Sequence, residues 1–261
     1  MGHPRTLAAA ALGLGIGLLG SSPASGAVLI DSFTTPAEGQ IALDSIADGN
    51  AGKTSLDMLP VLGGSREIFV FKTSQVGNGN QPVKASVNER DTAIFNFDQF
   101  SSTARGIGRL VYDGTADGQL TPQGFATGVD LTEGGANPGF RFEDVKVTGS
   151  GLMLTVNLFN HTSGQIFSSG PLTLVDGFLG ELFLPFSTFT GAGGTASNVG
   201  AIEIVVDGSA ENAFGSDLTF GLFSSGVPGP TPVPEPASLA LLACGLLLSG
   251  GYGLRKRAGS R

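Results

Sequence analysis

The chain has 261 residues, a formal net charge of −8 and a sequence pI near 4.7, with 41% hydrophobic and 14% charged residues. Its single cysteine and two histidines exclude a disulfide scaffold and a zinc site built from thiolates. The acidic balance argues against nucleic acid as a partner, because phosphate binding draws on clusters of lysine and arginine.

Residues 1–26 have the layout of a secretory signal peptide. A short basic start is followed by the apolar run at 7–20 and then by small residues. Ala24 and Gly26 supply the small side chains expected three residues and one residue before the cleaved bond. The sequence therefore predicts export with cleavage before Ala27, although cleavage after Ala24 or after Ala27 fits the same pattern.

Residues 27–225 form the predicted body, which is long enough for one domain with a substantial core. Nine basic and 21 acidic residues give this body a net charge of −12. Short runs of β-branched and aromatic residues, broken by Gly, Asn, Asp and Ser, predict strands and an all-β antiparallel sandwich of the jelly-roll type. The predicted strands are 28–33, 67–73, 83–87, 92–97, 108–113, 128–131, 140–147, 152–159, 171–175, 181–186, 201–207 and 218–223.

Two local patterns support this interpretation. In the run 201–207, Ile202, Ile204 and Val206 share one face and Glu203 points the other way, as in a half-buried strand. Asp-Gly pairs between the runs predict turns, because glycine accepts positive φ and the aspartate carboxylate accepts hydrogen bonds from turn amides. These pairs begin at Asp48, Asp113, Asp117, Asp176 and Asp207.

No catalytic arrangement stands out in the body, and we predict that the chain is not an enzyme. His161 is the only imidazole there, and its turn-like context at 160–164 predicts an exposed loop histidine rather than the base of a catalytic triad. No Gly-x-Ser-x-Gly elbow or nucleotide-binding glycine loop is present. A carboxylate-dependent hydrolase is the least favoured alternative, since sequence spacing does not give the separation of two carboxyl groups.

The C-terminal 36 residues predict an attachment to the membrane. Residues 226–236 contain five prolines and predict a stiff linker. The apolar stretch 237–254 would span about 27 Å as a helix, which is close to the thickness of a bilayer core. The basic segment 255–261 should remain cytoplasmic, so that the body lies outside.

This tail resembles the PEP-CTERM sorting signal of Gram-negative bacteria. The matching features are the motif Pro234, Glu235 and Pro236, the helix, and the basic cluster Arg255, Lys256 and Arg257. In that family an integral-membrane enzyme, exosortase, recognises the tail and removes the helix. The resemblance implies exosortase as a processing partner, release to the cell surface or extracellular matrix, and association with exopolysaccharide. The main hypothesis is therefore a non-catalytic structural or adhesive surface protein.

The body has a second resemblance, to galactose-binding-like jelly rolls, which include many carbohydrate-binding modules. The matching segments are 29–33, 182–191, 198–208 and 217–220. The resemblance implies a structural calcium ion held by Asp31 and Asp217, and it makes a carbohydrate-binding module with a defined glycan site the alternative function. The family's aromatic platform, usually tryptophan, has no counterpart, because the body lacks tryptophan and has one tyrosine, Tyr112.

Further oxygen-bearing side chains lie in glycine-rich loops of the body. Calcium prefers such oxygen ligands, and a secreted acidic protein meets calcium outside the cell. None of the residues follows the spacing of an EF-hand, and turn formation accounts for them equally well. They are Asp44, Asp48, Asn50, Asp113 and Asp117.

Overall fold

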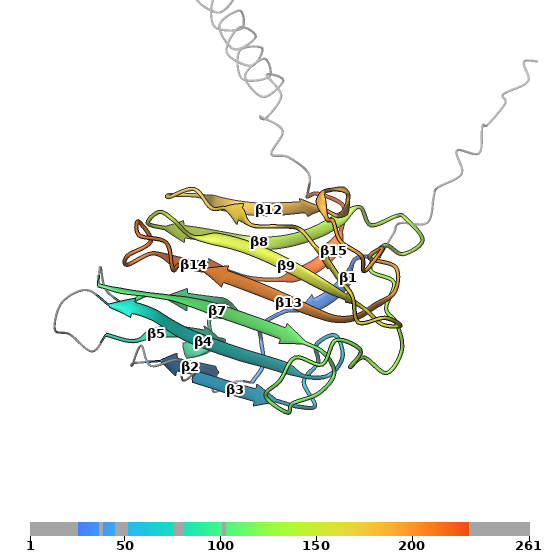
Figure 1. Ribbon diagram of the computed structural model, residues 1–261, viewed down its shortest axis with the longest axis horizontal. Coiled ribbons are helices and arrows are strands. Elements are labelled where there is room, and N and C mark those ends of the chain that lie inside the picture. Colours follow the sequence, from blue (N-terminus) through green and yellow to red (C-terminus); the bar gives the residue numbers. More distant parts are fainter. Residues whose placement is uncertain (1–25, 37–38, 45–51, 76–80, 101–102, 230–261) are drawn as a thin grey trace, which may run out of the picture.

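The computed structural model describes residues 26–36, 39–44, 52–75, 81–100 and 103–229 (Figure 1). Nearly all of the predicted signal peptide lies outside these ranges, as do the sorting motif, the apolar stretch 237–254 and the basic segment 255–261. Within the described ranges no helix is long and apolar enough to cross a membrane.

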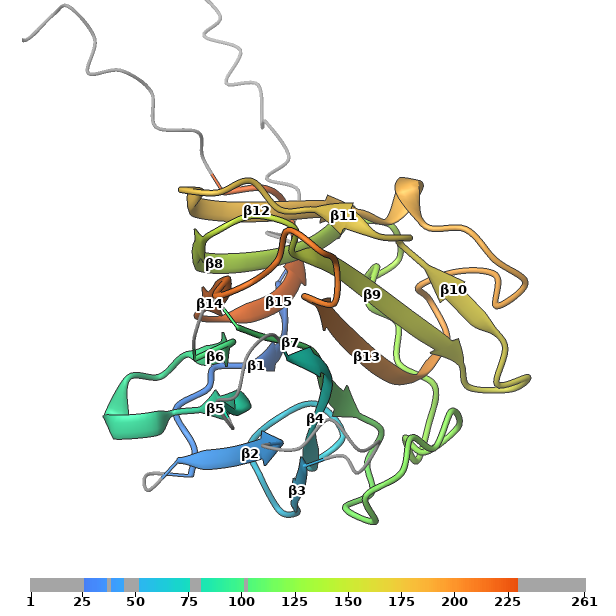
Figure 2. The same ribbon diagram turned by 60° about the vertical axis from the view of Figure 1, so that its left-hand side comes forward.

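The described residues form two antiparallel sheets packed face to face, which confirms the predicted all-β sandwich. Figure 2 separates the two layers. Sheet A contains β1 (Val28–Asp31), β2 (Gln40–Asp44), β5 (Val83–Val87), β6 (Phe95–Asp98), β8 (Gly139–Thr148), β12 (Leu179–Pro185), β14 (Asp217–Phe220) and β15 (Phe223–Gly226). Sheet B contains β3 (Gly52–Leu56), β4 (Arg66–Gln75), β7 (Ala104–Tyr112), β9 (Met153–Asn160), β10 (Ile166–Ser168), β11 (Leu172–Thr173) and β13 (Val199–Asp207). Two short 3₁₀ turns are η1 (Glu89–Asp91) and η2 (Phe186–Thr188).

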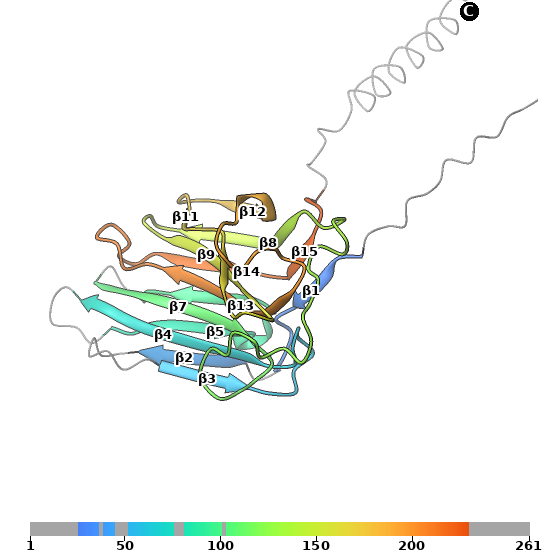
Figure 3. The same ribbon diagram turned by 45° about the vertical axis from the view of Figure 1, so that its right-hand side comes forward.

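Strand β8 is the centre of sheet A. It pairs with β12 along one edge and with β14 and then β15 along the other. Beyond β14 the sheet continues through β6 and β5 to β2, and β15 pairs with β1. Because Val28 of β1 lies opposite Ser225 of β15, the two ends of the described body leave the sandwich side by side (Figure 3).

The core between the sheets is rich in phenylalanine. Phe142 is 1% exposed, stacks on Phe223 with 4.6 Å between ring centroids, and meets the Phe220 ring edge-on at 5.2 Å. Tyr112 is also fully buried, so the body's one tyrosine is a core residue and not a surface platform. Phe100, at 49% exposure, is the phenylalanine that departs most clearly from this pattern.

The alternation predicted for 201–207 is confirmed in β13. Ile202, Ile204 and Val206 lie in the core, and Glu203 faces the outside of sheet B. Glu203 is nevertheless only 6% exposed, because it pairs with Arg109 of β7 and accepts a hydrogen bond from Asn157 of β9 at 2.8 Å.

Two predicted strands need correction. The run 128–131 is not a strand, because only Val129 forms a bridge, to Val199. The run 218–223 is two strands, because its pairing with β8 is interrupted between Thr219 and Phe223. There the amide of Gly221 donates to the carbonyl of Glu143 at 2.7 Å, and the amide of Glu143 donates to the carbonyl of Leu222 at 3.0 Å.

The Asp-Gly turns are confirmed at three described positions. The glycines after Asp113, Asp117 and Asp176 have φ of +79°, +76° and +76°. At Asp207 the carboxylate accepts a bond from an amide two residues further on, at 2.8 Å, while the following glycine does not have positive φ. Asp48 lies outside the described residues.

Candidate functional site

The outer face of sheet A carries two rows of polar side chains that cross the strands. They face outward because their strand neighbours, among them Val83, Ala85, Phe97 and Leu218, fill the core. In the first row Lys84 lies opposite Asp98, Asp98 opposite Asp217, and Asp217 opposite Thr148; in the second row Ser86 lies opposite Asn96, Asn96 opposite Thr219, and Thr219 opposite Lys146. With strands about 4.8 Å apart, each row extends for about 14 Å.

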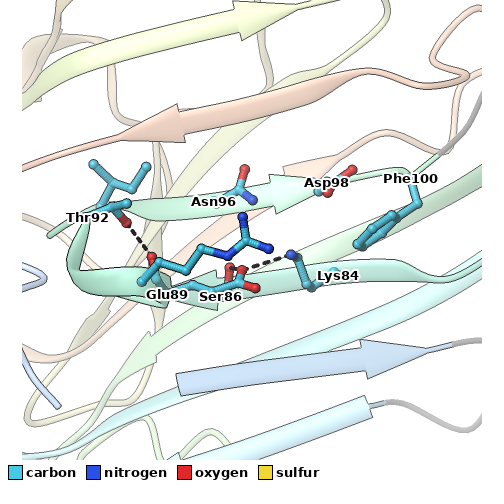
Figure 4. Close-up of a pocket in the computed structure, with 9 residues that line it drawn as sticks. Lys84, Ser86, Glu89, Thr92, Asn96, Asp98 and Phe100 are labelled. Carbon is cyan, nitrogen blue, oxygen red and sulfur yellow. Dashed lines mark hydrogen bonds and ion pairs between the residues drawn. The ribbon is translucent and has the colours of Figure 1, made fainter. Parts of the chain in front are cut away.

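A pocket opens at the β5–β6 end of this face, with a volume of about 400 Å³. This volume is within the range of small-molecule sites, about 300–1,000 Å³. Figure 4 shows the side chains that surround it. The lining residues are Lys84, Ser86, Glu89, Arg90, Thr92, Ile94, Asn96, Asp98 and Phe100.

Hydrogen bonds fix the side chains on one wall of the pocket. Lys84 Nζ donates to Glu89 Oε2 at 2.8 Å, and Ser86 Oγ donates to the same oxygen at 3.0 Å (Figure 4). The hydrogen bond from Lys84, assisted by that from Ser86, lowers the pKa of Glu89, so that this carboxylate is ionised. The Lys84 ammonium also lies 4.8 Å from the centre of the Phe100 ring, which holds the ring beside the pocket.

At the opposite side of the pocket, two carboxyl groups face each other across neighbouring strands. Asp98 of β6 and Asp217 of β14 are directly opposite and hydrogen-bonded through their side chains. Burial first, and then the charge of Asp98, raises the pKa of Asp217 to about 6. Burial also raises the pKa of Asp98. The pair therefore holds one shared proton in mildly acidic solution.

Replacement of Asp217 by asparagine is expected to stabilise the fold above neutral pH. The pKa of Asp217 is raised in the folded state, so its contribution to stability is full below about pH 4 and is lost as the pH rises through about 6. An asparagine amide donates the same hydrogen bond to Asp98 at every pH. Because the site is half-exposed, solvent screening limits the expected gain to about 1 kcal/mol near pH 7.5, with little change near pH 4.

Urea denaturation of both proteins at the two pH values measures this difference. The matched control is Asp144→Asn, at an exposed position of β8. An equal effect of both substitutions, or a gain at low pH only, would contradict the shared proton.

The structure places Asp31, a predicted calcium ligand, inside the core. Asp31 Oδ1 accepts a bond from the Phe33 amide at 2.7 Å, and Oδ2 accepts bonds from Arg66 Nη1 at 2.6 Å and the Tyr112 hydroxyl at 2.9 Å. Asp31 and Arg66 are both 0% exposed. Burial raises the pKa of Tyr112 far above its usual value, so its hydroxyl remains a donor. Asp31 therefore serves as the counter-ion of a buried arginine.

Asp31 and Asp217, the two predicted calcium ligands, are not brought together. Asp31 lies opposite Phe223, which follows Asp217 by six residues along the chain. Six residues of extended strand correspond to about 20 Å. One ion cannot contact both residues in this geometry. Within the described ranges, no group of three or more His, Cys, Asp or Glu side chains could hold a metal ion. Calcium binding at either residue stays a prediction.

The turn interpretation accounts for Asp113 and Asp117 among the other oxygen-bearing candidates that the structure describes. The Asp113 carboxylate accepts bonds from two amides of its own loop, at 3.0 and 2.7 Å, and Asp117 accepts one at 2.8 Å. Asp44 accepts a main-chain bond from the neighbouring β4 at 2.7 Å. Asp48 and Asn50 lie outside the described residues.

His161 lies in the turn after β9, as predicted, but it is half-buried rather than exposed. The backbone of Gly200 packs so closely that a Cβ there would be 2.7 Å from the His161 Cα, which explains the burial. The Nδ1 atom of His161 is enclosed and has no hydrogen-bond partner among the described residues. The acid of a triad is therefore not bonded to this nitrogen in the described part of the chain.

Sequence analysis did not identify the residues of the pocket. A signal for part of them is present in the run 83–87, where Lys84 and Ser86 alternate with core residues, and again at Asn96 and Asp98. Alternation shows that these side chains face outward but not that they meet. The position of Phe100 beside Lys84 follows only from the pairing of β5 with β6.

Comparison with known proteins assigns the chain to no family. No protein-family model matches it, and no curated protein sequence matches it. A family 11 carbohydrate-binding module of the cellulase Lic26A-Cel5E of Clostridium thermocellum is 11% identical, with coverage of 78% of this chain and 97% of the module and a TM-score of 0.37. The same family's module from that organism, in complex with a β-1,3-1,4-mixed-linked tetrasaccharide, is 12% identical, with coverage of 78% and 98% and a TM-score of 0.38.

The agarase AgWH50C is 14% identical, with coverage of 69% of this chain and 25% of the enzyme and a TM-score of 0.38. Likenesses with such low identities and TM-scores below 0.5 do not define a shared family. The fold class itself rests on the strand pairing described above.

Proposed function

We propose that the body is a non-catalytic glycan-binding module and that its ligand lies in the pocket on the outer face of sheet A. The observation that carries the proposal is the exposed Phe100 ring beside a row of hydrogen-bonding side chains on neighbouring strands. Most other large aromatic side chains in the described part of the chain are buried, whereas the exposed Phe100 ring is available to a ligand.

The pocket contains both kinds of group that contact a sugar: an aromatic ring and hydrogen-bonding side chains. One face of a pyranose carries C–H groups that pack against an aromatic ring such as Phe100. Its hydroxyl groups donate and accept hydrogen bonds, and Ser86, Thr92 and Asn96 supply hydroxyl and amide partners of both types. A pocket with apolar contacts and a few polar groups that orient the ligand is the usual form of a small-molecule site.

The carboxyl groups beside the pocket support binding rather than hydrolysis. Glycoside hydrolases use two carboxyl groups about 5 Å or more apart, so that one protonates the leaving oxygen while the other acts on the sugar. Asp98 and Asp217 instead hydrogen-bond to each other. In that arrangement each carboxyl group already has the other as its hydrogen-bond partner.

We further propose, from the sequence, that the module is exported and displayed at the cell surface or in the extracellular matrix. The signal peptide at 1–26 and the tail with Pro234, Glu235 and Pro236 support this proposal, with exosortase as the processing enzyme and exopolysaccharide as the source of glycan. Attachment through the C-terminal end is compatible with the fold, because that end leaves the sandwich beside β1.

The glycan site is tested by replacing Asn96 with alanine in the full-length chain. We expect binding to a panel of defined glycans to weaken about tenfold, which corresponds to the loss of one to two hydrogen bonds in a desolvated site. Calorimetric titration with the tightest-binding oligosaccharide measures the change.

The matched control is Thr155→Ala, which removes an outward polar group from β9 on the opposite sheet. Equal affinity of the two variants, or no saturable binding of the unmodified chain to any glycan, would overturn the proposal.

A further inference from the structure

The part of the outer face of sheet A around the pocket and the two polar rows has an unusual charge for this chain. Three of the nine basic residues of the body lie there: Lys84, Arg90 and Lys146. The acidic residues that face them are Glu89 of η1, Asp98 of β6 and Asp217 of β14. When all six groups are ionised their charges cancel, whereas the whole body carries −12.

The proton shared by Asp98 and Asp217 changes this balance. With that proton in place the six groups carry +1, and without it they carry no net charge. Lys84 and Glu89 act on Asp98, and Lys146 acts on Asp217, so both lysines lie within electrostatic range of the pair. Loss of the proton therefore places a second full negative charge at the side of the pocket.

Arg90 provides a cation that a ligand can reach. Its side chain is exposed at the pocket, and it forms no ion pair with any residue in the described ranges. The residue has φ of +61°, a conformation that side-chain-bearing residues adopt rarely. Arginine binds carboxylates through two parallel hydrogen bonds. Lys84, in contrast, already donates to Glu89.

From these positions we infer that the face binds an acidic polysaccharide, a chain of uronic acid units, in mildly acidic solution and releases it as the pH rises above neutral. This inference rests on the proposed function and names its class of ligand. Arg90 binds a uronate carboxylate, Phe100 packs against a sugar ring, and the proton on the Asp98–Asp217 pair keeps the pocket from repelling the polymer.

The pH range of binding follows from two ionisations: that of the uronate strengthens attraction to the pocket, and that of the Asp98–Asp217 pair weakens it. A uronic acid carboxyl group ionises near pH 4, as an ordinary side-chain carboxyl does. The pair keeps its shared proton until about pH 6. Between these values the polymer is anionic and the six charged groups around the pocket together carry +1, so attraction is strongest there. The negative charge on the rest of the body has less influence, because charges more than about 8–10 Å away are screened at physiological salt.

The test uses full-length chain, polygalacturonate oligomers and the same oligomers after methyl esterification, with EDTA to remove bridging cations. Esterification removes the charge and keeps the sugar ring, so it is a matched control for the ligand. We expect the charged oligomer to bind about tenfold more tightly near pH 5 than near pH 7.5, and the ester to bind equally at both.

Two variants assign the effect to the residues named. Asp217→Asn should bind the charged oligomer near pH 7.5 as tightly as the unmodified chain does near pH 5. Arg90→Gln should lose the preference for the charged oligomer over its ester. Thr155→Ala, on the opposite sheet, is the protein control.

The outcomes separate the two proposals. Equal, pH-independent binding of both oligomers would overturn the inference and leave the glycan-binding function intact. Failure of every glycan to bind this face would overturn both. A pH dependence that persists in Asp217→Asn would overturn the role of the carboxyl pair, and an unchanged preference in Arg90→Gln would overturn the role of Arg90.

Discussion

Replacement of Asp31 by asparagine is expected to lower the free energy of unfolding by about 3–5 kcal/mol, because it leaves a buried guanidinium without its counter-ion. Arg66 is 0% exposed, and its Nη1 atom lies 2.6 Å from Asp31 Oδ2. The other guanidinium nitrogens donate to Gln40 Oε1, at 2.9 Å, and to the carbonyl of Thr35. These neutral acceptors satisfy hydrogen bonds but do not balance the charge.

Urea denaturation near pH 7 measures the loss. The control is Glu181→Gln, which breaks a partly exposed ion pair with Arg141 and should cost less than about 1 kcal/mol. The double replacement of Asp31 and Arg66 by leucine and methionine should recover much of the loss, since paired apolar residues need no counter-ion. Similar small losses for Asp31→Asn and Glu181→Gln would contradict the buried ion pair.

The role of Asp31 shows why its chemistry could not be predicted from the sequence. An aspartate at the end of the first strand is equally suited to hold a metal ion or to balance a buried cation. The choice is decided by Arg66, which is 35 residues further along the chain. The sequence contains no local signal that this arginine points into the core.

Much of the fold was predictable because buried strands carry a strong local pattern. The run 83–87 coincides with β5, and the alternation in 201–207 matches the core side of β13. The strands without a prediction, β2, β3 and β10, all lie at sheet edges. Each of these strands has at most five residues and only one β-branched residue, so it lacks the β-branched runs on which the predictions depend.

The candidate site was less predictable because it is formed by pairing between distant segments. Asp98 and Asp217 lie far apart in the sequence and meet only because β6 pairs with β14. Composition gives only the average charge of the chain. The overall charge of −8 does not show that Lys84, Arg90 and Lys146 lie near Glu89, Asp98 and Asp217 in the fold.

Two phenylalanines of the chain should respond in opposite ways to the same replacement. Phe142→Ala is expected to cost about 3–5 kcal/mol of stability, because it opens a cavity in the centre of the core. Its ring is 1% exposed and stacks on Phe223 at 4.6 Å. Phe100→Ala removes a ring that is 49% exposed, so it should cost less than about 1 kcal/mol.

Glycan binding should show the reverse order. Phe100→Ala removes the surface against which a sugar ring packs, and we expect affinity to fall about tenfold or more. Phe142→Ala should bind nearly normally wherever it remains folded, because its ring lies on the core side of β8. Thermal unfolding and calorimetric titration of both variants measure the two effects. A large loss of stability in Phe100→Ala would show that this ring supports the fold, and normal glycan binding by the same variant would remove it from the site.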